Sequence, residues 1–430
     1  MQKALRYLSR MAVTIFLSGC AGAALLFIVY LLPTAPMKAN VQRGTIVYNT
    51  EGAIPQFVDG YANTKNDNET DAIMLSNAIY PVSSPIVDFL SVPSIDIKGD
   101  SNRTTSLLDY VNNVNENAQE TSTYPRYWHG YLTILKPLLL FFDFSDIRIF
   151  NMSLQLFLVI LLTADFTTYG LKNYLPSYYA FLLVINPVLT SFSFQVTDCF
   201  IITMLAMHFL FKKEKKKINN FFPYILFFMQ IGIVVSYFDF LTYPLVTLGV
   251  PLCLLLILQA DKITYLQKIK NIISLSIAWV IGYLGMWAMK WMIGSIATHK
   301  NIFMDAFEQI LLRTNTNDEG VYFSRWSAVT VNVMDFAKWT YLFIGIAIFI
   351  CIIIIGKSLC KKEILSCKTA NQFLQILPYV IICLYPFLWY LLASNHSYEH
   401  PRLAFREFSI FAFSACAGFS EFNHIRRQYQ

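Results

Sequence analysis

The chain has 430 residues, of which 56% are hydrophobic, 16% aromatic and only 14% charged. A soluble domain carries about 25% charged residues, so this composition excludes an ordinary soluble domain and predicts an integral membrane protein. The formal net charge of +6 does not indicate a nucleic-acid partner, because the basic residues fall mainly in short loops between apolar runs. That distribution is the one that orients membrane proteins, with the basic loops in the cytosol.

The first apolar run covers about 11–32 and follows three basic residues near the N-terminus, which predicts a cytosolic N-terminus. The sequence around Cys20 resembles a lipoprotein processing site. However, apolar sequence continues past it to Pro33, whereas a cleaved signal would give way to polar chain. We therefore expect residues 1–33 to form a cytosolic N-terminus and an uncleaved first membrane span.

Residues 34–147 form the one long polar insertion and are expected to lie outside the cytosol. Asn68 is suited to cap a short helix that continues to about residue 80, because acids occupy its first turn. The apolar segment 131–142 is too short to span a bilayer, since about 20 residues are needed, and is expected to lie on the membrane surface. Between these helices, residues 81–127 are rich in Asn, Asp, Ser and Thr and are expected to be irregular.

Nine further membrane spans are expected after this loop. They cover about 149–166, 178–194, 199–211, 221–238, 243–259, 272–294, 339–356, 374–393 and 408–420. With ten spans, the Lys-rich segments all fall on one side, which places both termini in the cytosol.

The expected fold class is thus an all-α polytopic membrane protein with about ten transmembrane helices. It divides into residues 1–33, the extracytoplasmic loop 34–147, and the remaining helices within 148–430. Two further outer loops are expected at 295–336 and 394–407.

Glu69 and Asp71 are the first candidates for chemistry. Two carboxylates two residues apart can bind a divalent cation such as Mg²⁺ or Mn²⁺, or one of them can act as a general base. The alternative is helix capping, because acids at a helix N-terminus interact favourably with the helix dipole and need no other role.

A second candidate is the aromatic run 124–130, which contains Arg126, Tyr127, Trp128 and His129. Aromatic faces stack on sugar rings, and an arginine beside them can hold an anion. The alternative is an interfacial belt, because Trp and Tyr concentrate at the headgroup level of membranes. An interfacial belt explains the aromatic residues but gives no reason for Arg126 and His129 to lie among them.

The outer segment before the last span supplies a third candidate. His396 and His400 are four residues apart, but Pro401 and the lack of a third ligand argue against zinc. Arg402 and Arg406 are also four apart and can share one helix face, where two guanidinium groups can hold a phosphate or diphosphate. The alternative is contact with ordinary lipid headgroups.

Asp239 lies among aromatic residues at the outer end of a span, and Arg325 lies beside Trp326 in an outer loop. Both are candidates for substrate binding, because charged residues near the membrane are often functional. Asp198, at the start of another span, is an equally plausible boundary residue.

This layout resembles the GT-C superfamily of membrane glycosyltransferases. In that family a long outer loop follows the first span, carries an acidic residue near its start and contains two helices along the membrane. Here Asp71 precedes the first candidate helix, and residues 131–142 match the second. The family often has adjacent acids, whereas this chain has Glu69 and Asp71 separated by one residue.

The resemblance implies a small bacterial, multi-pass plasma-membrane enzyme of inverting type. It would transfer a sugar from a polyprenyl-phosphate donor to a cell-surface glycan or a lipid-linked acceptor, with the loop acid as base. In that interpretation Arg402 and Arg406 hold the lipid phosphate, and Tyr127 and Trp128 stack on the sugar. Two alternatives stay open: a polysaccharide polymerase or ligase, and a transporter or flippase of lipid-linked sugars that performs no chemistry.

Overall fold

The computed structural model describes most of the chain. The described residues are 2–99, 102–215, 221–260, 262–318, 320–342, 345–346 and 369–428. The structure is mostly helical, at 77%, and within the described residues five helices are long and apolar enough to cross a membrane. They are Leu5–Tyr30, Phe144–Thr168, Phe194–Glu214, Tyr265–Thr298 and Leu374–Leu392. The expectation of a mostly helical chain is therefore confirmed, and these helices are consistent with a membrane protein, while the count of ten spans stays a prediction.

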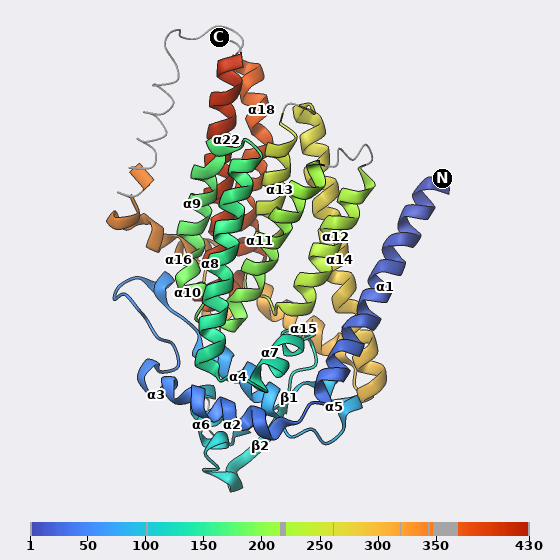
Figure 1. The fold of residues 1–430 in the computed structure, drawn as a ribbon, viewed down its shortest axis with the longest axis vertical. Helices are drawn as coiled ribbons and strands as arrows, with labels where there is room; N and C mark the ends of the chain where they lie inside the picture. Colours follow the sequence, from blue (N-terminus) through green and yellow to red (C-terminus); the bar gives the residue numbers. More distant parts are fainter. Residues whose placement is uncertain are drawn as a thin grey trace.

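One bundle contains all the long helices and several short ones. They are α1 (Gln2–Tyr30), α8 (Phe144–Thr168), α9 (Leu175–Ile185), α10 (Pro187–Thr190), α11 (Phe194–Lys215), α12 (Phe222–Phe238), α13 (Val246–Leu258), α14 (Tyr265–Thr298), α18 (Thr369–Cys383), α19 (Tyr385–Leu392) and α22 (Phe408–Gln428). Figure 1 shows the two ends of the chain on the same side of this bundle, opposite the elements built from residues 34–147. Most of the expected span at 339–356 lies outside the described residues.

The expected span at 178–194 is not one continuous helix. Asn186 adopts a left-handed conformation between α9 and α10, with φ of 54°, and Pro187 follows it. A residue before proline is disfavoured in the right-handed helical region, and proline has no N–H to continue the ladder. The Asn186 side chain caps the new helix by accepting from the Leu189 N–H at 3.5 Å.

Residues 34–147 form a folded loop domain at one end of the bundle (Figure 1). Its elements are α2 (Thr34–Gly44), η1 (Thr45–Val47), α3 (Tyr48–Glu51), η2 (Ala62–Thr64), α4 (Asn68–Ile79), α5 (Pro85–Ser91), β1 (Pro93–Ile97), α6 (Arg103–Val111), η3 (Glu116–Ala118), β2 (Gln119–Thr123) and α7 (Leu132–Leu139). β1 and β2 pair antiparallel, with Pro93 opposite Thr123 and Ile97 opposite Gln119.

The expectation that residues 81–127 are irregular is wrong. Two helices and the two strands fall in that range, and β1 is buried along its whole length. Ile95 of β1 and Leu107 of α6 belong to the same buried apolar cluster as Leu75 of α4. Local propensity is weak in such polar sequence, and contacts with distant elements override it.

The predicted helix after residue 68 is confirmed as α4, but the expected cap is wrong. Asp67 is the capping residue, and its carboxylate accepts from the Thr70 N–H at 3.0 Å. The Asn68 amide instead donates to Glu51 at 3.0 Å. It also accepts from Arg148 of α8 at 2.9 Å, so a tertiary contact takes the side chain away from the local cap.

The apolar segment 131–142 contains α7, and Figure 1 shows this helix where the loop domain meets the bundle. Leu132, Leu135 and Leu139 are buried, whereas Phe141 is 76% exposed. The pattern is that of an amphipathic element with one face on protein and an apolar end left open.

Two glycines bring α12 and α14 into close contact. A Cβ at Gly282 would lie 2.0 Å from the Met229 carbonyl oxygen, and one at Gly232 would lie 2.2 Å from the Trp279 carbonyl oxygen. Small residues at a helix crossing let two backbones approach closely. This crossing fixes one face of α14, and its neighbouring face carries the aromatic stripe described below.

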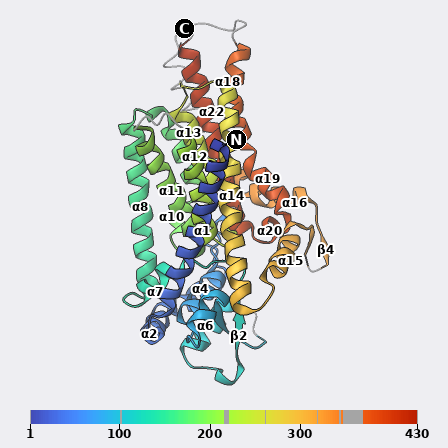
Figure 2. The ribbon, with the colours of Figure 1, turned by 90° about the vertical axis from the view of Figure 1, so that its right-hand side faces the viewer.

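A short 3-10 helix, η4 (Lys172–Tyr174), precedes α9. The other described elements belong to residues 302–337 and 394–407, and Figure 2 shows α15, α16 and α20 among them beside α14 and α19. They are α15 (Ile302–Thr314), β3 (Asn317–Asp318), β4 (Val321–Tyr322), α16 (Arg325–Val333), η5 (Met334–Ala337), α20 (Ser394–Glu399), α21 (Pro401–Ala404) and η6 (Phe405–Glu407).

Candidate functional site

Asp71 is fully buried between the loop domain and the bundle. Its Oδ1 atom accepts from the backbone N–H of Phe194 at 2.9 Å and of Gln195 at 3.4 Å, and from the Ser193 hydroxyl at 3.1 Å. The carboxylate therefore caps α11, a helix distant in sequence. Its Oδ2 atom is buried and has no hydrogen-bond partner among the described residues.

Burial raises the pKa of Asp71 from 3.8 to about 7, although the nearby Arg148 guanidinium acts in the opposite direction. A carboxyl group with this pKa exchanges a proton close to neutral pH. One oxygen is thus fixed by a helix N-terminus, while the other has no hydrogen-bond partner among the described residues and is shielded from solvent.

Asp67 lies one helical turn before Asp71 and forms an ion pair with Arg402. The Arg402 Nη2 and Nε atoms lie 2.7 and 2.8 Å from Asp67 Oδ2. Arg406 is completely buried and donates from one nitrogen to the Arg402 carbonyl at 2.6 Å. Its Nε and Nη2 atoms have no partner within the described part of the chain. The two predicted phosphate-binding arginines are thus brought together, with the charge of Arg402 already neutralised.

Glu69 and Asp71 point to different partners. Glu69 accepts from the Arg103 N–H at 2.8 Å, whereas Asp71 faces α11. Residues two apart on a helix lie on nearly opposite faces, so the two carboxylates do not converge on one ion. In the residues that the structure describes, no three His, Cys, Asp or Glu side chains form a metal-binding group.

The aromatic run 124–130 divides into buried and accessible members. Trp128 is fully buried, and its indole N–H donates to the Met286 carbonyl at 2.7 Å. The ring nitrogens of His129 contact the Tyr124 carbonyl at 2.9 Å and the Tyr131 hydroxyl at 3.1 Å. Burial lowers the pKa of His129 to about 3, so it is neutral in the structure. Trp128 therefore has no face open for a sugar in this conformation.

Asp239 and Arg325 have local structural contacts. The Asp239 carboxylate accepts from the backbone N–H of Leu241 at 2.9 Å and of Thr242 at 3.1 Å, which fixes the turn after α12. Arg325 is exposed and donates to the Leu391 carbonyl at 2.7 Å and the Thr314 carbonyl at 3.2 Å. It thus ties the end of α15 to the end of α19.

His396 and His400 pack against each other, with ring centroids 5.1 Å apart. Arg313 of α15 contacts His400, and its Nη1 atom lies 3.2 Å from His400 Nε2. Burial, together with the charges of Arg402 and Arg313, lowers the pKa of His400 to about 4. His400 is therefore neutral and accepts from Arg313, so the guanidinium of Arg313 meets no opposite charge there.

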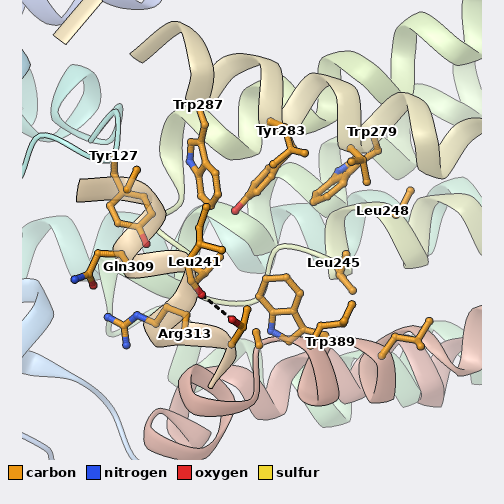
Figure 3. Close-up of a pocket in the computed structure, with 18 of the residues that line it drawn as sticks. Tyr127, Leu241, Leu245, Leu248, Trp279, Tyr283, Trp287, Gln309, Arg313 and Trp389 are labelled. Carbon is orange, nitrogen blue, oxygen red and sulfur yellow. Dashed lines mark hydrogen bonds between the residues drawn. The ribbon is translucent and has the colours of Figure 1, made fainter. Parts of the chain in front are cut away.

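The sequence interpretation missed an apolar groove of about 470 Å³ between α14, α15, α19 and the turn before α13. Trp279, Tyr283, Trp287 and Trp291 recur every four residues of α14 and form its wall. Residues four apart share a helix face, so this spacing was the signal that could have revealed the groove. Figure 3 shows the first three of these rings side by side along α14.

One end of the groove is polar. Tyr127, Gln309 and Arg313 lie together there, while Trp279 and Leu248 lie at the opposite end (Figure 3). Arg126 also lines the groove, but its guanidinium lies 2.9 and 3.0 Å from the two carboxylate oxygens of Asp305. The groove is therefore apolar along nearly all of its lining, with polar and charged side chains beside one end.

Two direct contacts, joined through short stretches of the polypeptide, connect this groove to the buried acids. Arg313 contacts His400, and Arg402, two residues further along the chain, pairs with Asp67. Asp67 begins the helix that carries Asp71. The fold thus brings two of the predicted regions, the loop acids and the segment 394–407, to one place.

No protein-family model, curated protein or solved structure matches this chain. Fold and site by themselves define a helical membrane protein with a folded loop domain, a cluster of buried charges and an aromatic-lined groove.

Proposed function

We propose that this protein is a membrane glycosyltransferase that uses a polyprenyl-phosphate sugar as donor. The observation that carries the proposal is the apolar groove with Arg313 at its polar end. A polyprenyl chain needs an extended apolar surface, and a phosphate needs a guanidinium or similar donor at the end of that surface. The acceptor is a cell-surface glycan or a lipid-linked glycan, and the site faces the outside of a bacterial plasma membrane.

In the proposed reaction, Asp71 Oδ2 takes the proton of an acceptor hydroxyl. The hydroxyl oxygen then attacks the anomeric carbon of the donor sugar, and the bond between that carbon and the phosphate oxygen breaks. The phosphate leaves with the bonding electrons and remains attached to its polyprenyl chain, so the configuration at the anomeric carbon inverts. A base with a pKa of about 7 is matched to this proton transfer, which contributes roughly 10²–10⁴-fold to rate.

Arg313 is the residue best placed to hold the phosphate, because it lines the groove and meets only a neutral partner. Arg402 and Arg406 help to fix the position of the segment that carries His400. Arg402 pairs with Asp67, and Arg406 donates a hydrogen bond to the Arg402 carbonyl. Tyr127 lies at the polar end of the groove and is the aromatic ring available to the sugar.

A gene deletion in the source organism tests the proposal whichever sugar the donor carries. Loss of the transferase should cause a polyprenyl-phosphate sugar to accumulate, as measured by mass spectrometry of extracted lipids. Wild type and the control Asp88→Asn should restore the normal amount, whereas Asp71→Asn should not. An unchanged lipid profile after deletion would contradict the proposal.

The same strain separates transfer from flipping. A donor left unused by a transferase remains exposed on the outer leaflet, where periodate that cannot cross the membrane oxidises its sugar. A donor left by an inactive flippase stays on the cytosolic leaflet and is protected in intact cells. Protection of the accumulated lipid would favour the flippase.

A further inference from the structure

The groove has two arginines at its edge, and among the described residues only one of them is paired with an acid. Arg126 and Arg313 are the two charged residues that line the groove. Arg126 is neutralised by Asp305, which contacts it through both carboxylate oxygens, whereas Arg313 contacts a neutral imidazole. In the described part of the groove, one guanidinium charge is therefore left uncompensated.

We propose that Asp305 is a specificity-determining residue that makes this groove select lipids with a singly charged phosphodiester headgroup over lipids with a diphosphate. The inference rests on the proposed function for the identity of the lipid. A polyprenyl-phosphate sugar carries a single negative charge, which Arg313 balances. A polyprenyl-diphosphate sugar carries two, and the second charge would meet the ion pair of Arg126 and Asp305.

The physical basis is that Asp305 already occupies the Arg126 guanidinium, so a second phosphate charge would find no free cation there and would lie near the Asp305 carboxylate. Specificity between related ligands often comes from an unfavourable element aimed at the wrong ligand, and like charges brought together in a partly buried site are such an element. Asp305 is itself half-buried on α15, with its side chain 42% exposed, while Arg126 is 22% exposed. Arg126 is further held by the face of the Tyr124 ring, 4.7 Å from its guanidinium carbon.

The ion pair also has a fixed position relative to the groove. Asp305 does not itself line the groove, but it lies four residues before Gln309 on the same face of α15, and Gln309 lines the groove. Trp291 of the aromatic stripe donates to the Arg126 carbonyl at 2.9 Å. The pair is thus attached to both walls at the polar end, where a second phosphate would enter.

Binding, rather than turnover, is the direct test. The full-length protein is placed in nanodiscs of phosphatidylcholine, and retained ligands are measured by native mass spectrometry. The probes are a polyprenyl-phosphate hexose, a polyprenyl-diphosphate hexose and dioleoylphosphatidylglycerol. Wild type should retain the phosphate hexose at least about tenfold better than the diphosphate hexose, which is the effect of one charge interaction of moderate strength.

Asp305→Asn frees the Arg126 charge and should improve binding of the diphosphate hexose by about tenfold. The matched control is Glu308→Gln, which removes the same charge from an exposed position on α15 and should leave the ratio unchanged. Arg313→Gln should weaken the binding of both polyprenyl lipids. Equal ratios for wild type, Asp305→Asn and Glu308→Gln would overturn the role of Asp305.

The phosphatidylglycerol arm identifies the source of the phosphodiester. This lipid has the same headgroup charge but two acyl chains, and it should compete poorly with the polyprenyl probe. Competition equal to that of the phosphate hexose would assign the groove to ordinary membrane lipid and would overturn the proposed lipid class. An unchanged lipid profile after gene deletion would contradict the proposed function but would leave the effect of Asp305→Asn on binding untouched. Failure of the proposed function and failure of this inference are therefore distinguishable.

Discussion

Replacing Asp71 by asparagine should remove function and yet make the protein more stable at alkaline pH. In the unfolded chain this carboxyl has its ordinary pKa of 3.8, and burial in the folded protein raises the pKa to about 7. Between these two values the folded state binds a proton that the unfolded state has lost. Wild-type stability should therefore fall as the pH rises from about 4 to about 7, and then stay at the lower level.

The difference between the two pKa values is about three pH units, which corresponds to about 4 kcal/mol of unfolding free energy. Asparagine keeps an oxygen for the N–H of Phe194 but places an NH₂ group where Oδ2 has no partner. An unpaired buried donor costs about 1–3 kcal/mol, and the protonated acid at low pH has a comparable unpaired O–H. We expect equal stability near pH 4 and a gain of about 1–4 kcal/mol for Asp71→Asn at pH 8.

The assay is thermal unfolding of the purified protein in detergent, followed by tryptophan fluorescence at pH 4 to 8. Asp88→Asn is the matched control, because the buried Asp88 carboxylate accepts from the backbone N–H of Ser83 and Ser84, just before α5, at 2.8 and 2.9 Å. That control should not gain stability at pH 8. A difference between Asp71→Asn and wild type that does not change with pH would refute the argument.

Three further outcomes follow from the fold. Arg148→Ala leaves Glu51 without the guanidinium that lies 2.8 Å away, and the loss of a largely buried partner should cost about 3–5 kcal/mol in chemical unfolding. Gly282→Ala brings a Cβ to 2.0 Å from the Met229 carbonyl, and forcing these backbones apart should cost about 1–3 kcal/mol in the same measurement. A reporter that works only in the cytosol should be active when fused after Lys270 and silent when fused within the loop domain.

Each of these outcomes has a control in the same chain. Gly285→Ala places its Cβ against the flexible end of the Ile15 side chain, at 2.8 Å, and should cost less than the substitution at the neighbouring glycine. Arg103→Ala removes a more exposed ion pair, with 35% of the arginine side chain accessible, and should cost less than Arg148→Ala. Reporter activity inside the loop domain would place the buried acids on the cytosolic side and end the proposal of an outer-face enzyme.

The sequence by itself determined the features that depend on composition and periodicity. Apolar runs near 11–32, 149–166, 199–211, 272–294 and 374–393 predicted the five helices of the described residues that are long and apolar enough to cross a membrane, because a bilayer selects length and hydrophobicity. The acids after residue 67 predicted α4, because helix starts carry a local signal. The exact cap could not be predicted, since Asn68 and Asp67 are both good capping residues and contacts with Glu51 and Arg148 decided between them.

Tertiary structure decided what each candidate side chain does. Asp71 caps α11, which begins more than a hundred residues later, and no local pattern encodes that contact. The neutral state of His129 and the occlusion of Trp128 follow from burial against other helices. Sequence and tertiary structure together determine the groove. The four-residue spacing of aromatic residues on α14 can be read from the sequence, but a cavity forms only when α15 and α19 fold against α14. The sequence therefore could not show which of the candidate side chains are charged and accessible. Long-range packing decides this, because burial and pairing set the charge and accessibility of each group.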